Sequence, residues 1–309
     1  MNPALPTSRD VAQPARERQP MTDAPSLPAT AADPLLTAIA AGTIVHDLAQ
    51  PLENGMPCSP NHPGFRMALL RRHGDGLRPD GSSAANELIV TGGHVGTHID
   101  ALSHASHHGR LFGGHDAAAA QQGGRFSVHG IDTVPPMVCR GVLLDVAAAH
   151  GTEILAAGYG ITADDLAHAA ARAGVLPAEQ DVCLVRTGWA RRWSDAEAYI
   201  GRETGVPGLT ESAAAWLADR GVRAIGADTT AVEQIPAGQG HAVLPVHRTL
   251  LVDRGVHLIE HMNLETLAAA GAAEFLFVLS PLKITGGTGS PVRPLAVLTA
   301  PTAAPQESR

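Results

Sequence analysis

One stretch, residues 92–108, reads GGHVGTHIDALSHASHH. Four candidate ligands lie inside an eleven-residue span of this stretch: His94, His98, Asp100 and His104. The apolar run 88–90 that precedes the stretch is typical of a strand. Two imidazoles and a carboxylate this close together form a compact ligand set for a divalent transition metal. Because three protein ligands leave coordination positions for water and substrate, such a set is typical of a catalytic rather than a structural site.

The chain carries 16 histidines, so some clustering by chance is expected. Two neighbouring glycines nevertheless favour the metal interpretation. Gly93 and Gly96 allow the backbone a tight path on which short side chains converge on one point. His104, four residues past Asp100, is predicted to be a further ligand or a base beside the metal-bound water. Proton transfer at this point requires a group with a pKa near 7, and His104 is the nearest candidate.

The stretch from His94 to His104 resembles the His-x-Gly-Thr-His-x-Asp-x-Pro-x-His signature of the metal-dependent cyclase family. That family includes bacterial kynurenine formamidases and isatin hydrolases. One position departs, because Leu102 stands where the signature has proline. The resemblance extends from about residue 44 to 297. It implies the family's swivelling β/β/α fold, a homodimer or homotetramer, the first two histidines and Asp100 as metal ligands, and His104 as general acid/base.

A second pair, His247 and Glu260, lies thirteen residues apart in the C-terminal part of the chain. Their spacing alone says little, since isolated charged residues are usually exposed. The resemblance implies that they bind a second metal, with Asp100 bridging, as in kynurenine formamidases. Isatin hydrolases, similar in the first motif, work with a single manganese. We therefore expect one or two divalent ions, Zn²⁺ or Mn²⁺, because the ligand types suit both.

The composition is that of an ordinary globular protein, with 309 residues, 44% apolar and 17% charged. A net charge of −8 without basic blocks argues against nucleic acid or an anionic membrane as partner, and the small-molecule substrate is what the family resemblance implies. No apolar run approaches the ~20 residues that span a bilayer. Cys58, Cys139 and Cys183 are widely spaced, and the N-terminus has no secretory signal pattern. Both features predict a cytoplasmic protein.

Strands and helices alternate along the chain, which predicts an α/β fold. Residues 1–33, rich in proline, alanine and charge, are predicted to be a disordered tail, with one hydrolase domain over 34–300 and a flexible tail over 301–309. The predicted strands are 44–48, 65–71 (half-buried), 86–91, 141–146, 181–186, 223–227, 256–260, 275–279 and 295–298. The predicted helices are 35–41, 161–173, 210–220, 247–253 and 264–270. The glycine-rich segment 109–124 is predicted to be a loop over the site.

Several residues outside the motif are candidates for lesser roles. Asp228 and Glu233 follow a strand, where α/β sites gather polar groups, so they are expected to support the site from behind. His115 in the glycine-rich loop is a candidate for covering the substrate, and Trp189 is expected to pack in the core. The segment 286–290 reads GGTGS, but no lysine follows it, which favours a structural turn over a phosphate cradle.

These observations predict a hydrolase that uses metal-activated water on a small amide, cyclic imide, lactam or lactone, with His104 passing a proton to the leaving atom. An isatin-like substrate is favoured over N-formylkynurenine. The loop 56–60 reads MPCSP where kynurenine formamidases place a tryptophan. Arylformamidase activity and ring formation stay open as alternatives. A non-enzymatic metal protein is disfavoured, because a structural site would require a fourth ligand and no open position.

Overall fold

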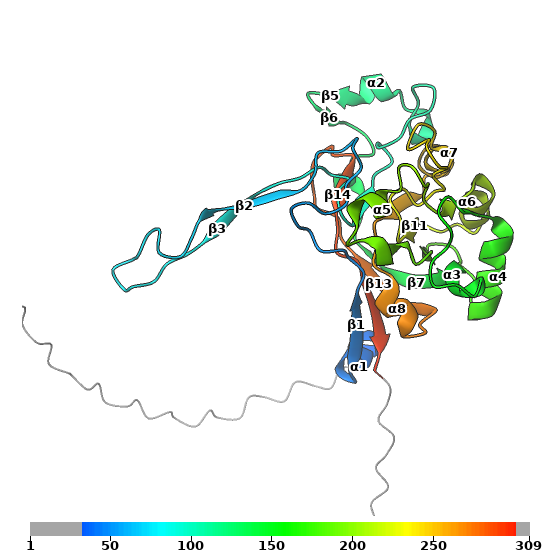
Figure 1. Cartoon of the computed structure of the whole chain (residues 1–309), viewed down its shortest axis with the longest axis horizontal. Helices are drawn as coiled ribbons and strands as arrows, with labels where there is room; N and C mark the ends of the chain where they lie inside the picture. The colour runs from blue at the N-terminus through cyan, green and yellow to red at the C-terminus, as the bar shows by residue number, and fades with distance from the viewer. Residues whose placement is uncertain (1–32, 301–309) are drawn as a thin grey trace, which may run out of the picture.

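A nine-stranded sheet forms the centre of the protein in the computed structural model, which describes residues 33–300 (Figure 1). Four central strands, β7, β9, β11 and β12, run parallel, and antiparallel strands flank them on both sides. In spatial order the strands are β1 (Thr43–Asp47), β15 (Leu295–Thr299), β13 (Glu274–Leu279), β7 (Met137–Asp145), β9 (Val182–Arg186), β11 (Ala224–Ala227), β12 (His257–Glu260), β4 (His98–Asp100) and β14 (Gly289–Pro291). The predicted α/β class is confirmed.

Helices cover the parallel strands because these strands are largely apolar. Every residue of β9 and β11 is buried, as expected for parallel strands covered on both faces. On one face, side chains such as Leu166 and Leu217 pack against Val185, and on the other Leu267 and Phe277 belong to a second core cluster. The helices are α1 (Pro34–Ala40), α2 (Ala117–Ala120), α3 (Val146–Ala149), α4 (Ala163–Ala173), α5 (Ala196–Ile200), α6 (Glu211–Ala218), α7 (Pro245–His247) and α8 (Glu265–Ala269).

Local sequence signals explain where the helices begin and end. Thr162 and Asp165 form a capping box at the start of α4, and Gly174 ends the helix in the left-handed conformation. The predicted helix 247–253 exists, but most of it is a π-helix, η4 (Arg248–Arg254). Three short 3₁₀ helices complete the set: η1 (Phe112–Gly114), η2 (Ile131–Thr133) and η3 (Trp189–Arg192). No helix within residues 33–300 is long and apolar enough to cross a membrane.

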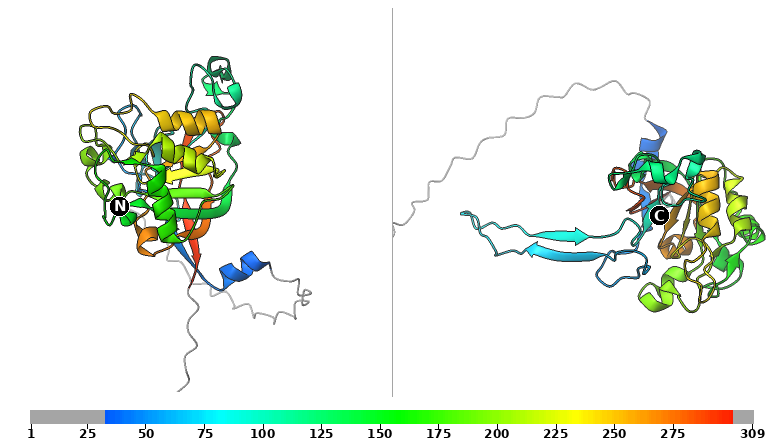
Figure 2. Two further views of the ribbon diagram at one scale, coloured as in Figure 1. Left: turned by 90° about the vertical axis from the view of Figure 1, so that its right-hand side faces the viewer. Right: turned by 90° about the horizontal axis from the view of Figure 1, so that it is seen from above.

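A hairpin of β2 (Arg66–Arg71) and β3 (Asn86–Val90), which we call the arm, projects far from the sheet (Figure 2). All residues of both strands are exposed. The prediction of a half-buried strand over 65–71 is therefore wrong, and only Phe65 at the base of the arm is buried. Alternating side chains indicate an extended strand but do not say which surface covers it.

The glycine-rich segment 109–124 contains η1, α2 and β5 (Gln121–Gln122), and β5 pairs with β6 (Arg125–Phe126). It forms a small lobe at one end of the molecule (Figure 1). The remaining strand pair joins β8 (Gly160–Ile161) to β10 (Gly208–Leu209). The predicted tails lie outside the described residues, apart from Asp33, which caps α1.

Candidate metal centre

Two glycines make room for the first histidines, one in the turn that leads into β4 and one on the neighbouring strand β14. Gly96 has a φ of +63°, and a β-carbon there would lie 2.4 Å from the side chain of Leu52. Gly289 on the neighbouring strand β14 is equally constrained, since a β-carbon there would lie 2.5 Å from the ring of His94. Glycine is therefore required at both positions, so that His94 can lie flat against β14 and His98 can start β4.

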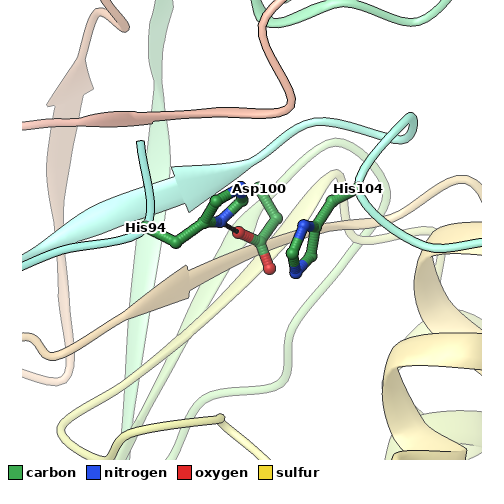
Figure 3. Close-up of side chains that lie close together, drawn as sticks. All are labelled: His94, Asp100 and His104. Carbon is green, nitrogen blue, oxygen red and sulfur yellow. Dashed lines mark hydrogen bonds and ion pairs between the residues drawn. The ribbon is translucent and has the colours of Figure 1, made fainter. Parts of the chain in front are cut away.

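His94, Asp100 and His104 lie side by side (Figure 3). Nδ1 of His94 lies 2.7 Å from Oδ1 of Asp100, and its Nε2 lies 2.9 Å from the hydroxyl of Thr288. The ring of His104 stacks on that of His94, with ring centres 3.9 Å apart. The sequence motif thus brings its aspartate and two of its three histidines into direct contact.

Glu260 joins the motif because β12 pairs with β4 in a register that places Glu260 opposite His98. Its Oε2 lies 3.4 Å from Nε2 of His98, and its Oε1 lies 3.3 Å from Nε2 of His247. His247, at the end of α7, also approaches Oδ2 of Asp100 at 3.7 Å. Two carboxylates therefore lie between imidazoles contributed by distant parts of the chain. We call these six residues the histidine–carboxylate cluster: His94, His98, Asp100, His104, His247 and Glu260.

A third carboxylate, Glu233, holds His247 from behind. It accepts hydrogen bonds from the backbone N–H groups of Val246 and His247 and from Nδ1 of the His247 ring. The imidazole therefore keeps its Nε2 directed at Glu260 and Asp100. The position of Glu233 agrees with its expected supporting role. Asp228 instead binds the backbone of Thr187 and Gly188, away from the cluster.

The donor set of the cluster fits a divalent cation. Oδ2 of Asp100 and Oε1 of Glu260 are buried and accept no hydrogen bond from any described residue. Burying a carboxylate oxygen without a partner is costly, and a bound cation would offset that cost. Ligand atoms of Asp100, His247 and Glu260 lie within 4.8 Å of one another, and so do those of His94, Asp100 and His104. Imidazole and carboxylate together suit zinc and manganese.

Burial and mutual charge shift the pKa values of the cluster. Burial lowers the pKa of His98 to about 4 and that of His104 to about 3, so both rings are neutral at pH 7. The expected pKa near 7 for His104 is therefore wrong, since burial among other imidazoles disfavours its charged form. Burial raises the pKa of Glu260 to about 7. Burial would also raise the pKa of Asp100, but the surrounding imidazoles hold it below its usual value.

A cavity of about 840 Å³ opens beside the cluster, between the loop 55–66 and the segment 195–204. His62 lines this cavity, and its ring stacks on that of His94 at 5.3 Å. Met56 and Phe65 supply apolar surface to the cavity, and Arg202 supplies a charge. The ligand atoms themselves do not line it, so His62 is the group that connects the cavity to the cluster.

Other predicted residues lie away from the cluster. Phe112 packs against Gly255 and the core, and His115 contacts the ring of His129. The place over a substrate predicted for His115 is not supported by any contact with the cluster or with the lining of the cavity. Trp189 is buried and donates its indole N–H to the carbonyl of Tyr199, which agrees with a packing role.

Sequence reasoning missed His62, Thr288 and His261. Thr288 belongs to the segment 286–290, which does form a turn, but the turn also delivers a hydroxyl to His94. His261 directly follows Glu260, and that adjacency was the one sequence signal for it. No signal marked His62, which lies 32 positions before His94 in a proline-rich loop.

The protein combines a mixed α/β sheet with a buried cluster of histidines and carboxylates, and these two features define its class. The model of the Cyclase family, described as "Putative cyclase", matches residues 46–234, and the chain belongs to this family. The isatin hydrolase of Roseibium aggregatum is 34% identical over 118 residues, which cover 37% of this chain and 44% of that protein. The alignment thus spans less than half of this relative.

Solved structures share the whole fold. A structure described as a novel cyclase has a TM-score of 0.76 at 28% identity and covers 86% of this chain and 93% of its own. Isatin hydrolase A from Ralstonia solanacearum has a TM-score of 0.66 at 25% identity, with 88% of this chain and 100% of that chain covered. The predicted relationship to the cyclase family is therefore confirmed.

Proposed function

We propose that the protein is a metal-dependent hydrolase that opens a C–N or C–O bond of a small amide, cyclic imide, lactam or lactone. The single observation that carries the proposal is the burial of Asp100 and Glu260 between imidazoles beside a cavity, with one oxygen of each carboxylate accepting no hydrogen bond from the described residues. Membership of the cyclase family and the similarity to isatin hydrolases support the same activity.

Five residues would hold the cation or cations: His94, His98, Asp100, His247 and Glu260. Asp100 contacts the imidazoles of His94 and of His247, so it is the residue suited to bridge two ions. A bound Zn²⁺ or Mn²⁺ would supply Lewis acidity toward a carbonyl oxygen and lower the pKa of water toward neutrality. The donor set accommodates one or two ions.

His104 is suited to move the proton. It is neutral at pH 7, lies beside Asp100 and is half-buried at the edge of the cluster. Burial holds the pKa of this ring below the range that suits a base, and the charge of Asp100 acts in the opposite direction; on that basis we assign the transfer of a proton from attacking water to the leaving nitrogen or oxygen to a ring nitrogen of His104. Asp100 stabilises the resulting imidazolium by charge.

The cavity supports a small substrate, because it combines apolar side chains with the half-buried ring of His62. The absence of a tryptophan in the loop 56–60 favours a cyclic amide of the isatin kind over N-formylkynurenine. The same cluster could act in the direction of ring formation, so both directions belong in the assay.

Metal analysis of the purified protein by plasma mass spectrometry, beside hydrolysis of isatin and N-formylkynurenine, tests this proposal. We expect about one or two equivalents of zinc or manganese, and isatin as the better substrate. The His94→Ala variant should lose metal and activity, whereas the control His168→Ala, at an exposed position of α4, should keep both. Wild-type protein that stays substoichiometric in metal after reconstitution would overturn the proposal.

We further propose a homodimer or homotetramer as the working form. The arm supports this, because both of its strands are exposed although Met67, Leu88 and Ile89 are apolar. A two-stranded hairpin alone is marginally stable in water, and a second copy of the chain would cover it.

Three unpaired cysteines within the described residues support a cytoplasmic location.

A further inference from the structure

His261 lies directly behind the histidine–carboxylate cluster in a strained conformation. Its φ is +55°, a value that non-glycine residues adopt rarely, and its side chain is buried. Backbone contacts hold it on both sides: its N–H donates to the carbonyl of Thr229, and its carbonyl accepts from the hydroxyl of Thr97. Strain that the surroundings maintain in this way is typical of functional sites.

The hydrogen bonds around Tyr199 fix which nitrogen of His261 carries the proton. The hydroxyl of Tyr199 lies 3.2 Å from the carbonyl oxygen of Asp228 and 3.2 Å from Nδ1 of His261. The carbonyl can only accept, so the hydroxyl donates to it and accepts from the N–H at Nδ1. Neutral His261 therefore has its lone pair on Nε2.

His98 and His247 follow the same pattern. Nδ1 of His98 donates to the carbonyl of Gly96, and Nδ1 of His247 bonds Glu233. In each case Nε2 is left facing Glu260. A partner on one ring nitrogen that orients the other is the usual arrangement of histidines that bind metals.

We propose that His261 is a further cation ligand, which binds through Nε2 together with His98 and Glu260. Ligand atoms of these three residues lie within 4.8 Å of one another, and all three side chains are buried. Glu260 presents Oε1 to His247 and Oε2 to His98, so the new position lies on the Oε2 side. This inference rests on the proposed metal dependence and adds a ligand to it.

The His261→Asn variant tests the assignment, because asparagine tolerates a positive φ and so preserves the backbone while removing the imidazole. Equilibrium dialysis against Zn²⁺ and, separately, Mn²⁺ measures the affinity and the number of ions bound. We expect the affinity for one of the bound ions to fall at least about tenfold. Removing a residue that hydrogen-bonds a metal ligand already costs about that much, and removing the ligand itself should cost no less. The chelator-treated forms of variant and wild type should unfold at similar temperatures.

A matched control is His129→Asn, since His129 also has a positive φ, of 58°, and hydrogen-bonds a backbone carbonyl, that of Phe112. This variant should bind both ions as the wild type does. His261→Asn protein that binds as tightly as wild type would overturn the ligand assignment and leave the hydrolase proposal intact. Wild-type protein that binds neither ion would overturn both.

A second variant, Tyr199→Phe, keeps the test decisive if His261→Asn does not fold. It removes the hydroxyl that accepts from Nδ1 and leaves His261 in place. We expect a several-fold weaker affinity for the same equivalent, because the ring loses its fixed tautomer. Unchanged affinity in folded Tyr199→Phe protein would count against the assignment.

Discussion

His104 contacts the rest of the cluster through ring stacking on His94, and its side chain is less buried than those of the other cluster residues. We therefore expect it to act on a substrate rather than to hold a cation. For His104→Ala we expect the metal content of the wild type and a loss of kcat of at least about 100-fold, the usual contribution of a positioned acid/base.

Plasma mass spectrometry and the hydrolysis rate, measured on the same His104→Ala sample, decide the point. Loss of metal from this variant would make His104 a ligand and would remove the proposed proton carrier. Full activity with full metal content would assign the proton transfer to another group, and His62 would then be the first candidate because its ring also stacks on His94.

Glu233 is a positioning residue, since it contacts the ring and backbone of His247 and none of the other cluster residues. In Glu233→Gln the amide keeps the shape of the carboxylate but loses its charge, so it holds Nδ1 of His247 less firmly. We expect cation affinity to fall by about 10- to 100-fold. Metal-free melting temperature separates this effect from general destabilisation, and unchanged affinity would contradict the assigned role.

At the residue scale, the sequence predicted the members of the cluster that lie close together in the motif. His247 and Glu260 required the family resemblance, because nothing in their spacing shows that β12 pairs with β4. Tyr199 and Thr288 could not be predicted at all. Thr288 meets His94, and Tyr199 meets His261, through tertiary packing, which a single sequence does not encode in any local pattern.

The arm is the element whose exposure most requires explanation. Met67 and Ile89 are directly opposite across its two strands. In the double variant Met67→Glu and Ile89→Lys, the new side chains can pair with each other and preserve the hairpin while removing apolar surface. If a second copy covers the arm, the dissociation constant of the oligomer should rise at least about tenfold.

Size-exclusion chromatography with light scattering measures this change over a range of protein concentrations. Leu176→Lys is a suitable control, because Leu176 is also exposed and apolar but lies outside the arm. Its assembly should match that of the wild type. A wild-type protein that is monomeric at all concentrations would contradict the proposed oligomer.

At the element scale, the buried central strands were predictable because parallel strands require unbroken apolar runs, as in 182–185 and 224–227. The short strands β4 and β14 were not predicted. Each has three residues, and β4 consists largely of the polar side chains of the site itself. The polar residues that the site requires here replace the apolar pattern by which strands are recognised.

At the scale of the whole molecule, alternation of strands and helices predicted the class, but not the order of strands in the sheet. That order depends on which strands pair over long separations, such as β1 with β15. The cluster depends on the same long-range pairing, since its members come from β4, α7 and β12 and from the turns before and after β4.

The contact between His94 and Thr288 spans 194 positions of the chain, and β14 closes the sheet beside β4. A ribosome therefore releases the motif residues long before it makes the strand that covers them. Until then one side of β4 is an open edge, and His94 lacks the hydroxyl of Thr288. The cluster can thus acquire its full surroundings only after β14 has been made, so chains that terminate before it carry the signature without a finished site.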